Sequence, residues 1–358
     1  MLDVPIVVLF PYMERKVLVA FLFLVLAAPA QLTQSTGDEF TVLVFHDIHA
    51  DSYPPSFTMA ADWLLGVNGR GPGRVSGISY YNIKAISGVG DYTTPCTSAG
   101  ASCTAAWNLF KPDWDRIHAA GLPGIWTRGN HDTNAYSFGT LSGVTYGSNP
   151  SWQATTFDVS TSRGLVRLGL VGVDVGDDLS AGQAARAFVD GIIAGSQAER
   201  QWMFLRHVGP AEPYGDVTPR IAPPNGGDAG AWCDPCAGYS GVNSAMGLLN
   251  NFFYTVTRVF WFATGHYSYG AAMIQVTASD GHVISGIGNN GGDGGLGHVT
   301  IFKFQPSLGH VQIVHYLIGD SATPAGSMFG SLQTLDWVLQ TRAIRLFPRP
   351  SPGRRRGR

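Results

Sequence analysis

The sequence predicts a globular protein of the α/β class, and two observations support this prediction. Apolar runs of strand length, such as residues 41–45 and 165–175, alternate along the chain with stretches of helical periodicity, such as residues 107–120. Of the 358 residues, 45% are hydrophobic and only 13% are charged, a composition typical of chains that bury a substantial core. We therefore expect one large ordered domain with many loops.

The remaining elements follow from the same patterns. Residues 209–240 are rich in proline, glycine and aspartate, which predicts a long loop. Residues 286–291 match a dinucleotide-binding fingerprint, but more glycine follows instead of a helix, so we interpret them as a loop between strands. The other predicted helices are 59–67, 181–206 and 244–254, and the other predicted strands are 124–127, 257–264 and an antiparallel series at 273–276, 282–285, 299–304 and 310–317.

The amino terminus resembles a targeting segment. Arg15 and Lys16 precede an apolar run at 17–26, and Ala28-Pro29-Ala30 has the small-x-small spacing of a cleavage site. We therefore predict a signal peptide over residues 1–30, with Met13 as a candidate start, and a protein that is secreted or lies in an endomembrane or vacuolar lumen. An uncleaved anchor remains the alternative, although the apolar run is short for a bilayer span. No stable membrane span is expected after cleavage.

Charge separates the predicted mature domain, residues 31–341, from a tail at 342–358 that holds seven arginines and no acid. The tail is predicted to be disordered. The domain carries 14 basic and 23 acidic residues, a net charge near −9. Because phosphate backbones require clustered cations, we expect no nucleic-acid partner.

The four cysteines predict disulfides. An even number behind a signal peptide is typical of oxidised secreted proteins, and local pairing of Cys96 with Cys103 and Cys233 with Cys236 is the simplest of three connectivities. The spacing of Cys233 and Cys236 also occurs in redox and zinc motifs. However, neither a helix start nor a second closely spaced pair accompanies it, so a structural disulfide is favoured.

Polar residues follow several of the predicted strands. Because ligands gather at the carboxyl ends of strands in α/β sheets, these residues can converge. Carboxylates, imidazoles and amide oxygens suit zinc, manganese or iron, and a carboxylate such as Asp91 can bridge two ions. The segments are Asp47-Ile48-His49, Gly90-Asp91, Gly129-Asn130-His131-Asp132, His207 and Gly265-His266. We interpret His46, His118, His310 and His315 as ordinary polar groups at sheet ends.

This ordered series resembles the calcineurin-like metallophosphoesterase superfamily, whose pattern is Asp-x-His, Gly-Asp, Gly-Asn-His-Asp/Glu, His and Gly-His-x-His. The match spans roughly residues 41–300, and its most specific part is residues 129–132. The resemblance implies a four-layer α/β sandwich of two mixed sheets flanked by helices. It also implies two divalent metal ions: Asp47 and His49 on the first, Asp91 bridging, and Asn130, His207 and His266 on the second.

The same resemblance implies a reaction. His131 would face the phosphate and stabilise the transition state or protonate the leaving oxygen, and Asp132 would orient it. A hydroxide bridging the metals would hydrolyse a phosphate ester, with monoesters favoured, on a phosphorylated small-molecule or lipid substrate. A weak echo of the acid sphingomyelinase and endopolyphosphatase branch, in Asp51 and Tyr53, makes a phosphodiesterase or polyphosphatase the first alternative.

One position departs from the family pattern. Ser268 stands where the second histidine of Gly-His-x-His would complete the first metal site. A water, or a ligand such as His282 or His298, would then have to complete that site. A catalytically degenerate metal-binding protein with the same fold is therefore the second alternative.

Overall fold

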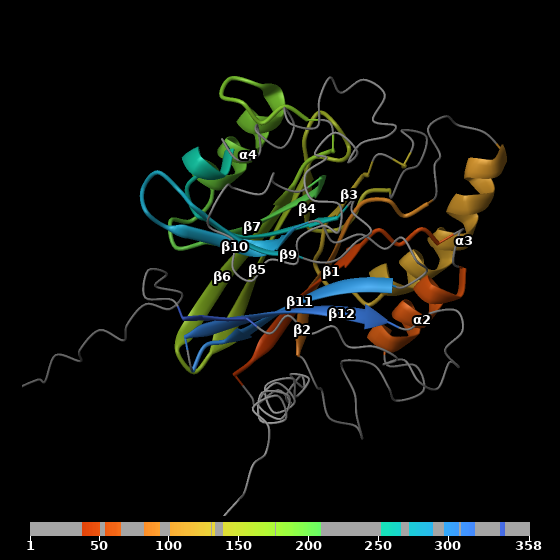
Figure 1. The fold of residues 1–358 in the computed structure, drawn as a ribbon, viewed down its shortest axis with the longest axis horizontal. Coiled ribbons are helices and arrows are strands. Elements are labelled where there is room, and N and C mark those ends of the chain that lie inside the picture. Colours follow the sequence, from red (N-terminus) through yellow and green to blue (C-terminus); the bar gives the residue numbers. More distant parts are fainter. Residues whose placement is uncertain are drawn as a thin grey trace, which may run out of the picture. The chain divides into compact units, whose positions relative to one another are not determined.

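The computed structural model describes twelve stretches of the chain, all within one compact unit that spans residues 33–358. These stretches are residues 38–50, 54–65, 82–93, 101–129, 131–132, 139–175, 177–208, 252–265, 272–288, 297–307, 309–318 and 337–340. They form two mixed β-sheets and three long helices (Figure 1).

The first sheet has six strands in the order β13-β12-β11-β1-β2-β3. Neighbouring strands β1, β2 and β3 run parallel, whereas β11, β12 and β13 join them in antiparallel pairs. The parallel half therefore brings the carboxyl ends of β1, β2 and β3 to one edge. The bounds are β1 Phe40–His46, β2 Ile83–Val89, β3 Trp126–Thr127, β11 Gly297–Gln305, β12 His310–Ile318 and β13 Trp337–Gln340.

The second sheet has seven strands in the order β4-β5-β6-β7-β8-β10-β9. Its central strands β6, β7, β8 and β10 run parallel, and β4–β5–β6 and β9–β10 pair antiparallel. The bounds are β4 Val144–Tyr146, β5 Gln153–Thr161, β6 Gly164–Gly172, β7 Gln201–Val208, β8 Val259–Gly265, β9 Ala272–Thr277 and β10 Val283–Gly288.

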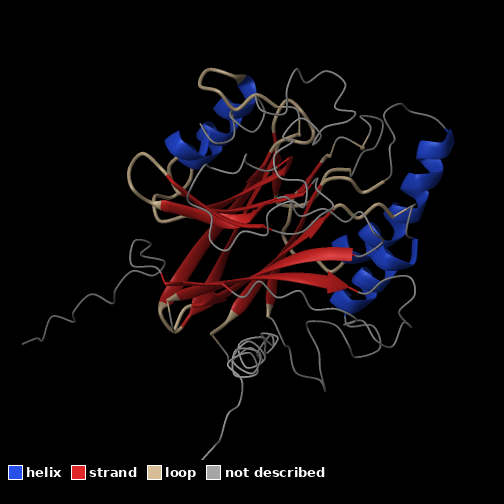
Figure 2. Cartoon of the chain, viewed as in Figure 1, coloured by secondary structure: helices blue, strands red, loops and turns tan. Residues whose placement is uncertain are grey.

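The two sheets pack face to face over one apolar core. Alternate residues of β1, such as Val42 and Val44, meet Leu168 and Leu170 of β6 and Trp261 of β8 in this core. The opposite faces carry helices: α2 (Pro54–Leu65) and α3 (Ala101–His118) on the first sheet, and α4 (Ala184–Gly195) on the second. Figure 2 shows the strands between these two helical layers. The predicted four-layer α/β sandwich is confirmed.

The outer helices are held by apolar contacts that the sequence pattern explains. On the first sheet, Phe45 of β1 packs edge-on against Phe57 of α2, and Phe110 of α3 stacks on Tyr92. On the second sheet, Val189 and Ile193 of α4 lie on one face of the helix and join the outer core. Because both faces of each sheet are covered, the central strands are buried on both sides.

Three predictions about elements were wrong in part. The predicted helix 181–206 ends at Gly195, and residues 201–208 form strand β7. Residues 286–288, interpreted as loop, belong to β10. The predicted antiparallel series is divided, because β10 pairs parallel with β8 whereas β11 and β12 belong to the other sheet. Strands β2, β4, β5 and β13 were not predicted.

Other predictions concern parts of the chain that the structure does not describe. These are the signal peptide, the loop 209–240, the arginine-rich tail, and three of the four cysteines, Cys96, Cys233 and Cys236. Of the predicted helix 244–254, only the helical turn 252–255 is described. Among the described residues, no helix is both long enough and apolar enough to cross a membrane.

Candidate metal centre

Three predicted ligands from different strands meet at one edge of the sandwich. Asp47 follows β1, Asp91 follows β2 and His207 lies near the end of β7, so both sheets contribute. One ligating atom of each lies within 4.8 Å of the others. The side chains are 3%, 2% and 0% exposed. Two carboxylates and an imidazole, buried together, can hold a divalent metal ion.

Asp91 is the centre of this cluster. Its Oδ2 atom lies 3.0 Å from Nε2 of His207, 3.9 Å from Nε2 of His131 and 4.0 Å from Nε2 of His49. Its Oδ1 atom accepts a hydrogen bond from the backbone amide of His131 at 3.0 Å. Nε2 of His207 also lies 4.0 Å from Oδ1 of Asp47. The carboxylate predicted to bridge therefore stands among three predicted site histidines.

Two of these histidines are oriented by backbone carbonyls. Nδ1 of His49 is 3.1 Å from the carbonyl of Thr93, and Nδ1 of His207 is 2.8 Å from that of Val89. Because a carbonyl can only accept, each Nδ1 carries a proton and donates it. In a neutral ring the lone pair is then on Nε2, the nitrogen nearest Asp91. This is the usual arrangement of metal-binding histidines, whose other nitrogen donates to a carbonyl or carboxylate.

The backbone at three predicted ligands is strained. Asp47, His49 and Asp91 have φ values of +41°, +42° and +50°, in the left-handed region that residues other than glycine seldom adopt. Such outliers persist where the surrounding structure imposes them, and they concentrate at functional sites. Two glycines permit the close approach of the loops around Asp91. A Cβ on Gly90 would lie 2.3 Å from the amide nitrogen of Gly129, and a Cβ on Gly129 would lie 2.0 Å from Oδ1 of Asp91.

Asp132 joins the loops after β2 and β3. Its two carboxylate oxygens accept hydrogen bonds from the amides of Tyr92 and Gly129, both at 2.9 Å. The Tyr92 hydroxyl strengthens the junction, since it donates to the carbonyl of Thr127 at 2.6 Å and accepts from the amide of Gly90 at 3.0 Å. The carboxylate is thus engaged with backbone amides, and its predicted orientation of His131 remains a prediction.

Burial and charge set the protonation of the cluster. Burial, and then the charge of Asp91, raises the pKa of Asp132 from 3.8 to about 7. Burial alone would lower the pKa of His207, but Asp91 and Asp47 outweigh it and raise that pKa to about 9. The pKa of Asp91 is below its usual range because His207, His131 and His49 outweigh its burial. A divalent cation would therefore compete with a proton on His207.

Other predicted site residues lie outside the described parts of the chain. Asn130, His266 and Ser268 are among them, so their predicted roles remain predictions. The end of β8 is described, and Gly265 pairs with Val208, the residue after His207. The chain therefore leaves the described region beside the cluster, one residue before His266.

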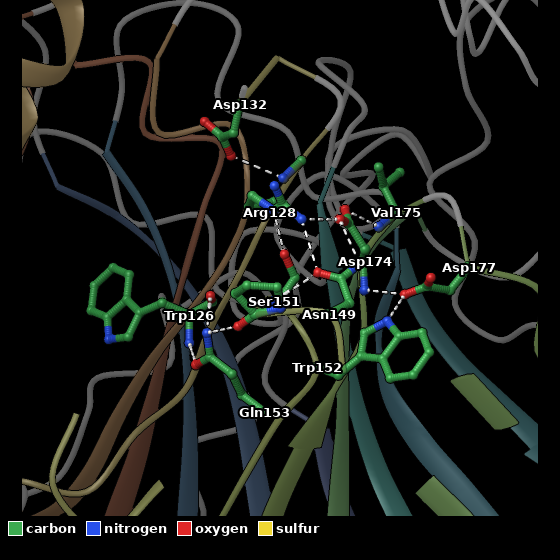
Figure 3. A network of polar contacts seen from close by, with 12 residues as sticks. Trp126, Arg128, Asp132, Asn149, Ser151, Trp152, Gln153, Asp174, Val175 and Asp177 are labelled. Carbon is green, nitrogen blue, oxygen red and sulfur yellow. Dashed lines mark hydrogen bonds and ion pairs between the residues drawn. The ribbon is translucent and has the colours of Figure 1, made fainter. Parts of the chain in front are cut away.

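The sequence analysis missed two residues near the cluster as contributors to the site, one buried and one half-buried. Arg128 and Asp174, 2.8 Å apart between Nη2 and Oδ2, form an ion pair between the two sheets (Figure 3). Asp174 follows β6 at the same edge as His207. Asp174 lies inside the predicted strand 165–175, whereas β6 ends at Gly172, so the rule that identified Asp47, a polar residue after a predicted strand, did not select it.

Comparisons with known proteins add little to this geometry. No family model matches the chain, and no curated protein matches it. Among solved structures, the chain is similar to GAP50, described as the anchor in the inner membrane complex of Plasmodium. The TM-score is 0.43 and the identity 13%, over 84% of this chain and 89% of that chain. A likeness of this size assigns no activity to the chain.

Proposed function

We propose that this chain is a metal-dependent phosphoesterase, with phosphomonoesters as its favoured substrates. The observation that carries the proposal is the arrangement around Asp91, whose Oδ2 lies within 4.0 Å of Nε2 of His207, His131 and His49. Carbonyl bonds to Nδ1 of two of these rings leave Nε2 for a metal. The ordered sequence motifs that contain these residues support the same assignment.

The residues divide the proposed reaction between them. Two divalent cations would supply a lowered water pKa and positive charge beside the phosphoryl oxygens. Asp47, His49, Asp91 and His207 would hold the cations, together with Asn130 and His266. His131 differs from the buried ligands because its side chain is 21% exposed. It can therefore contact a phosphate group and donate a proton to the leaving oxygen.

The first experiment measures metal content and turnover together. Metal in the purified protein is quantified by plasma mass spectrometry, and hydrolysis of aryl phosphate mono- and diesters is measured with added manganese or zinc. We expect bound metal and faster hydrolysis of the monoester. Preferential hydrolysis of the diester would instead support the diesterase alternative. Stoichiometric metal without turnover would support the degenerate binding protein that Ser268 suggests.

Asp91→Asn tests the site itself. Loss of the central charge should lower kcat by more than about a hundredfold, beyond the 10–100-fold effect of outer-shell partners. Asp113→Asn is the control, because Asp113 is also buried but accepts hydrogen bonds from Thr58 of α2 and from Arg116 of its own helix α3. Far-ultraviolet circular dichroism checks that both variants fold. Wild-type turnover in folded Asp91→Asn would overturn the proposed site.

A further inference from the structure

A buried arginine connects the predicted catalytic loop to the opposite sheet. Arg128 follows β3 in the six-stranded sheet, directly before Gly129, and is 8% exposed. Its guanidinium donates to the hydroxyl of Ser151, to Oδ1 of Asn149 at 2.9 Å and to Oδ2 of Asp174 at 2.8 Å (Figure 3). All three partners belong to the segments that flank β5 and β6 of the seven-stranded sheet. The loop 129–132 is therefore fixed to that sheet through the residue that precedes it.

The turn that carries Asp174 is internally bonded. Oδ1 of Asp174 accepts from the amide of Val175 at 2.8 Å. Oδ2 of Asp177 accepts from the amide of Asp174 at 2.7 Å and from the indole of Trp152 at 2.5 Å. The amide of Asp177 in turn donates to the carbonyl of Asp174 at 3.2 Å. These bonds fix the position of the Asp174 carboxylate relative to β6.

A second buried arginine reaches the same turn from β7. Arg206 is 1% exposed and directly precedes His207. Its Nη2 atom donates to the carbonyls of Val175 at 2.7 Å and Asp177 at 3.0 Å. Arg206, directly before His207, and Arg128, directly before the loop 129–132, therefore both bond to the turn from Asp174 to Asp177.

We propose that the turn from Asp174 to Asp177 is a positioning clamp for the metal centre, which fixes His207 relative to the loop 129–132 through Arg206 and Arg128. The inference rests on the proposed function for the identity of the metal centre. None of the clamp residues is a predicted ligand, so all of them act through the residues that follow the arginines. Groups hydrogen-bonded directly to metal ligands change metal affinity by about 10–100-fold when they are removed, and because the clamp acts through neighbouring residues we expect an effect at the low end of that range.

The chain offers a matched ion pair for comparison. Arg200 and Asp158 lie 3.0 Å apart in the same sheet, and the arginine side chain is 9% exposed, against 10% for Arg128. Arg200 precedes β7, whereas Arg206 lies near its carboxyl end, so the matched pair is at the opposite end of that strand. The carboxylates differ, since the side chain of Asp158 is 36% exposed and that of Asp174 is 18% exposed; a purely structural role for Asp174 therefore predicts a change in global stability, but none at the metal centre, in either variant. A positioning role predicts effects on the metal centre from Asp174→Asn alone.

Two measurements compare the variants. Titration calorimetry with manganese should show about tenfold weaker binding for Asp174→Asn and unchanged binding for Asp158→Asn. Hydrogen exchange of the metal-free proteins should show faster exchange at the amides of Gly129 and His131, and near His207, in Asp174→Asn only. Urea unfolding monitors the global stability of both variants, so that the local effect can be separated from a general loss.

Each outcome decides one of the two proposals. Equal exchange at the site in Asp174→Asn and Asp158→Asn would overturn the clamp, whatever the metal results. If the wild type binds no metal, the proposed function fails, and the exchange of the metal-free proteins still decides whether the clamp positions these segments. The second variant, Arg128→Lys, applies if Asp174→Asn does not fold. Lysine retains the charge but cannot reproduce the planar guanidinium that bonds three partners. Hydrogen exchange at Gly129, at His131 and near His207 should therefore increase to a smaller extent, and no increase would contradict the clamp.

Discussion

The two sheets present their predicted metal ligands in different ways. In the six-stranded sheet, Asp47, His49 and Asp91 lie beyond the strand ends and have left-handed backbone. In the seven-stranded sheet, His207 is still within β7, at a point where the pairing of β7 with β8 shifts register. Such an irregularity re-aims a side chain without a left-handed residue.

This difference indicates which changes each half tolerates. We call the ligands after β1 and β2 the loop half of the site, and His207 in β7 the strand half. The loop half depends on the close approach of Gly90, Gly129 and Asp91, so added atoms should disturb it most. The seven-stranded sheet holds β7 by its backbone pairing with β6 and β8, which does not depend on the His207 side chain, so this ligand should be removable with less damage to the fold. Substitutions that add atoms next to the backbone should therefore lower stability most in the loops. Removal of the ligand side chain in the strand should lower metal binding with less effect on stability.

The largest effect is expected from Gly129→Ala. The new Cβ would lie 2.0 Å from Oδ1 and 2.4 Å from the backbone nitrogen of Asp91, and the backbone atom cannot rotate away. We expect a loss of about 3 kcal/mol or more in unfolding free energy, together with loss of metal binding. Gly191→Ala in α4 is the control, since its Cβ would meet nothing within 4 Å, and alanine should stabilise the helix by up to about 1 kcal/mol. Urea unfolding of both variants measures this difference. Equal changes in unfolding free energy for Gly129→Ala and Gly191→Ala would contradict the prediction.

A smaller effect, limited to stabilisation by metal, is expected from His207→Ala, with His46→Ala as its control. Both histidines are fully buried. His46 uses both ring nitrogens within the fold, since Nδ1 is 3.0 Å from the Thr264 carbonyl and Nε2 is 2.7 Å from the Thr300 hydroxyl. Manganese at a hundred times its Kd should stabilise the wild type by about 2.7 kcal/mol.

That stabilisation should be absent in His207→Ala and retained in His46→Ala, which should instead lose stability with or without metal. Thermal unfolding with manganese and with a chelator measures the difference. Metal-induced stabilisation of His207→Ala equal to that of the wild type would show that this histidine is no ligand.

Local sequence patterns were sufficient where a strand is isolated by polar residues. Residues 41–45 and 257–264 were predicted as strands because apolar runs end there in polar or glycine residues, and the structure confirms them as β1 and β8. Asp47 was found because it follows such a run, whereas Asp91 and His207 were assigned from their places in the ordered series of motifs. The structure brings these three together.

Patterns failed where burial on both faces removes the alternation of a strand. Residues 201–208 form β7 between β6 and β8, so both faces are covered, and their continuous apolar character resembles that of a buried helix. Gly195 and Ser196, where α4 ends, were the available signal for a break. The pairing of Arg128 with Asp174 depends on which sheets face each other, and no local pattern contains that information.

The smallest effect is a pH dependence in the strand half. Burial, and then the charge of Asp174, raises the pKa of Asp177 from 3.8 to about 6. Because the folded pKa is the higher one, the carboxyl group contributes stability below pH 4, and that contribution is lost as the pH rises through 6. A two-unit shift corresponds to about 3 kcal/mol, and partial exposure of the side chain reduces the expected change to about 1–2 kcal/mol.

Asp177→Asn isolates the contribution of Asp177 ionisation to stability, because asparagine retains an oxygen that can accept from Trp152 and from the amide of Asp174. Unfolding free energies of wild type and variant, measured in chelator from pH 4 to pH 7, should diverge in favour of the variant as the pH rises. Since Arg206 bonds the carbonyl of Asp177 and not its carboxylate, manganese affinity at pH 7 should not fall in the variant. If the unfolding free energies of wild type and variant change in parallel with pH, ionisation of Asp177 does not lower the stability of the fold. A tenfold loss of manganese affinity in the variant would show that the charge of Asp177, and not only the backbone of its turn, holds the strand half in place.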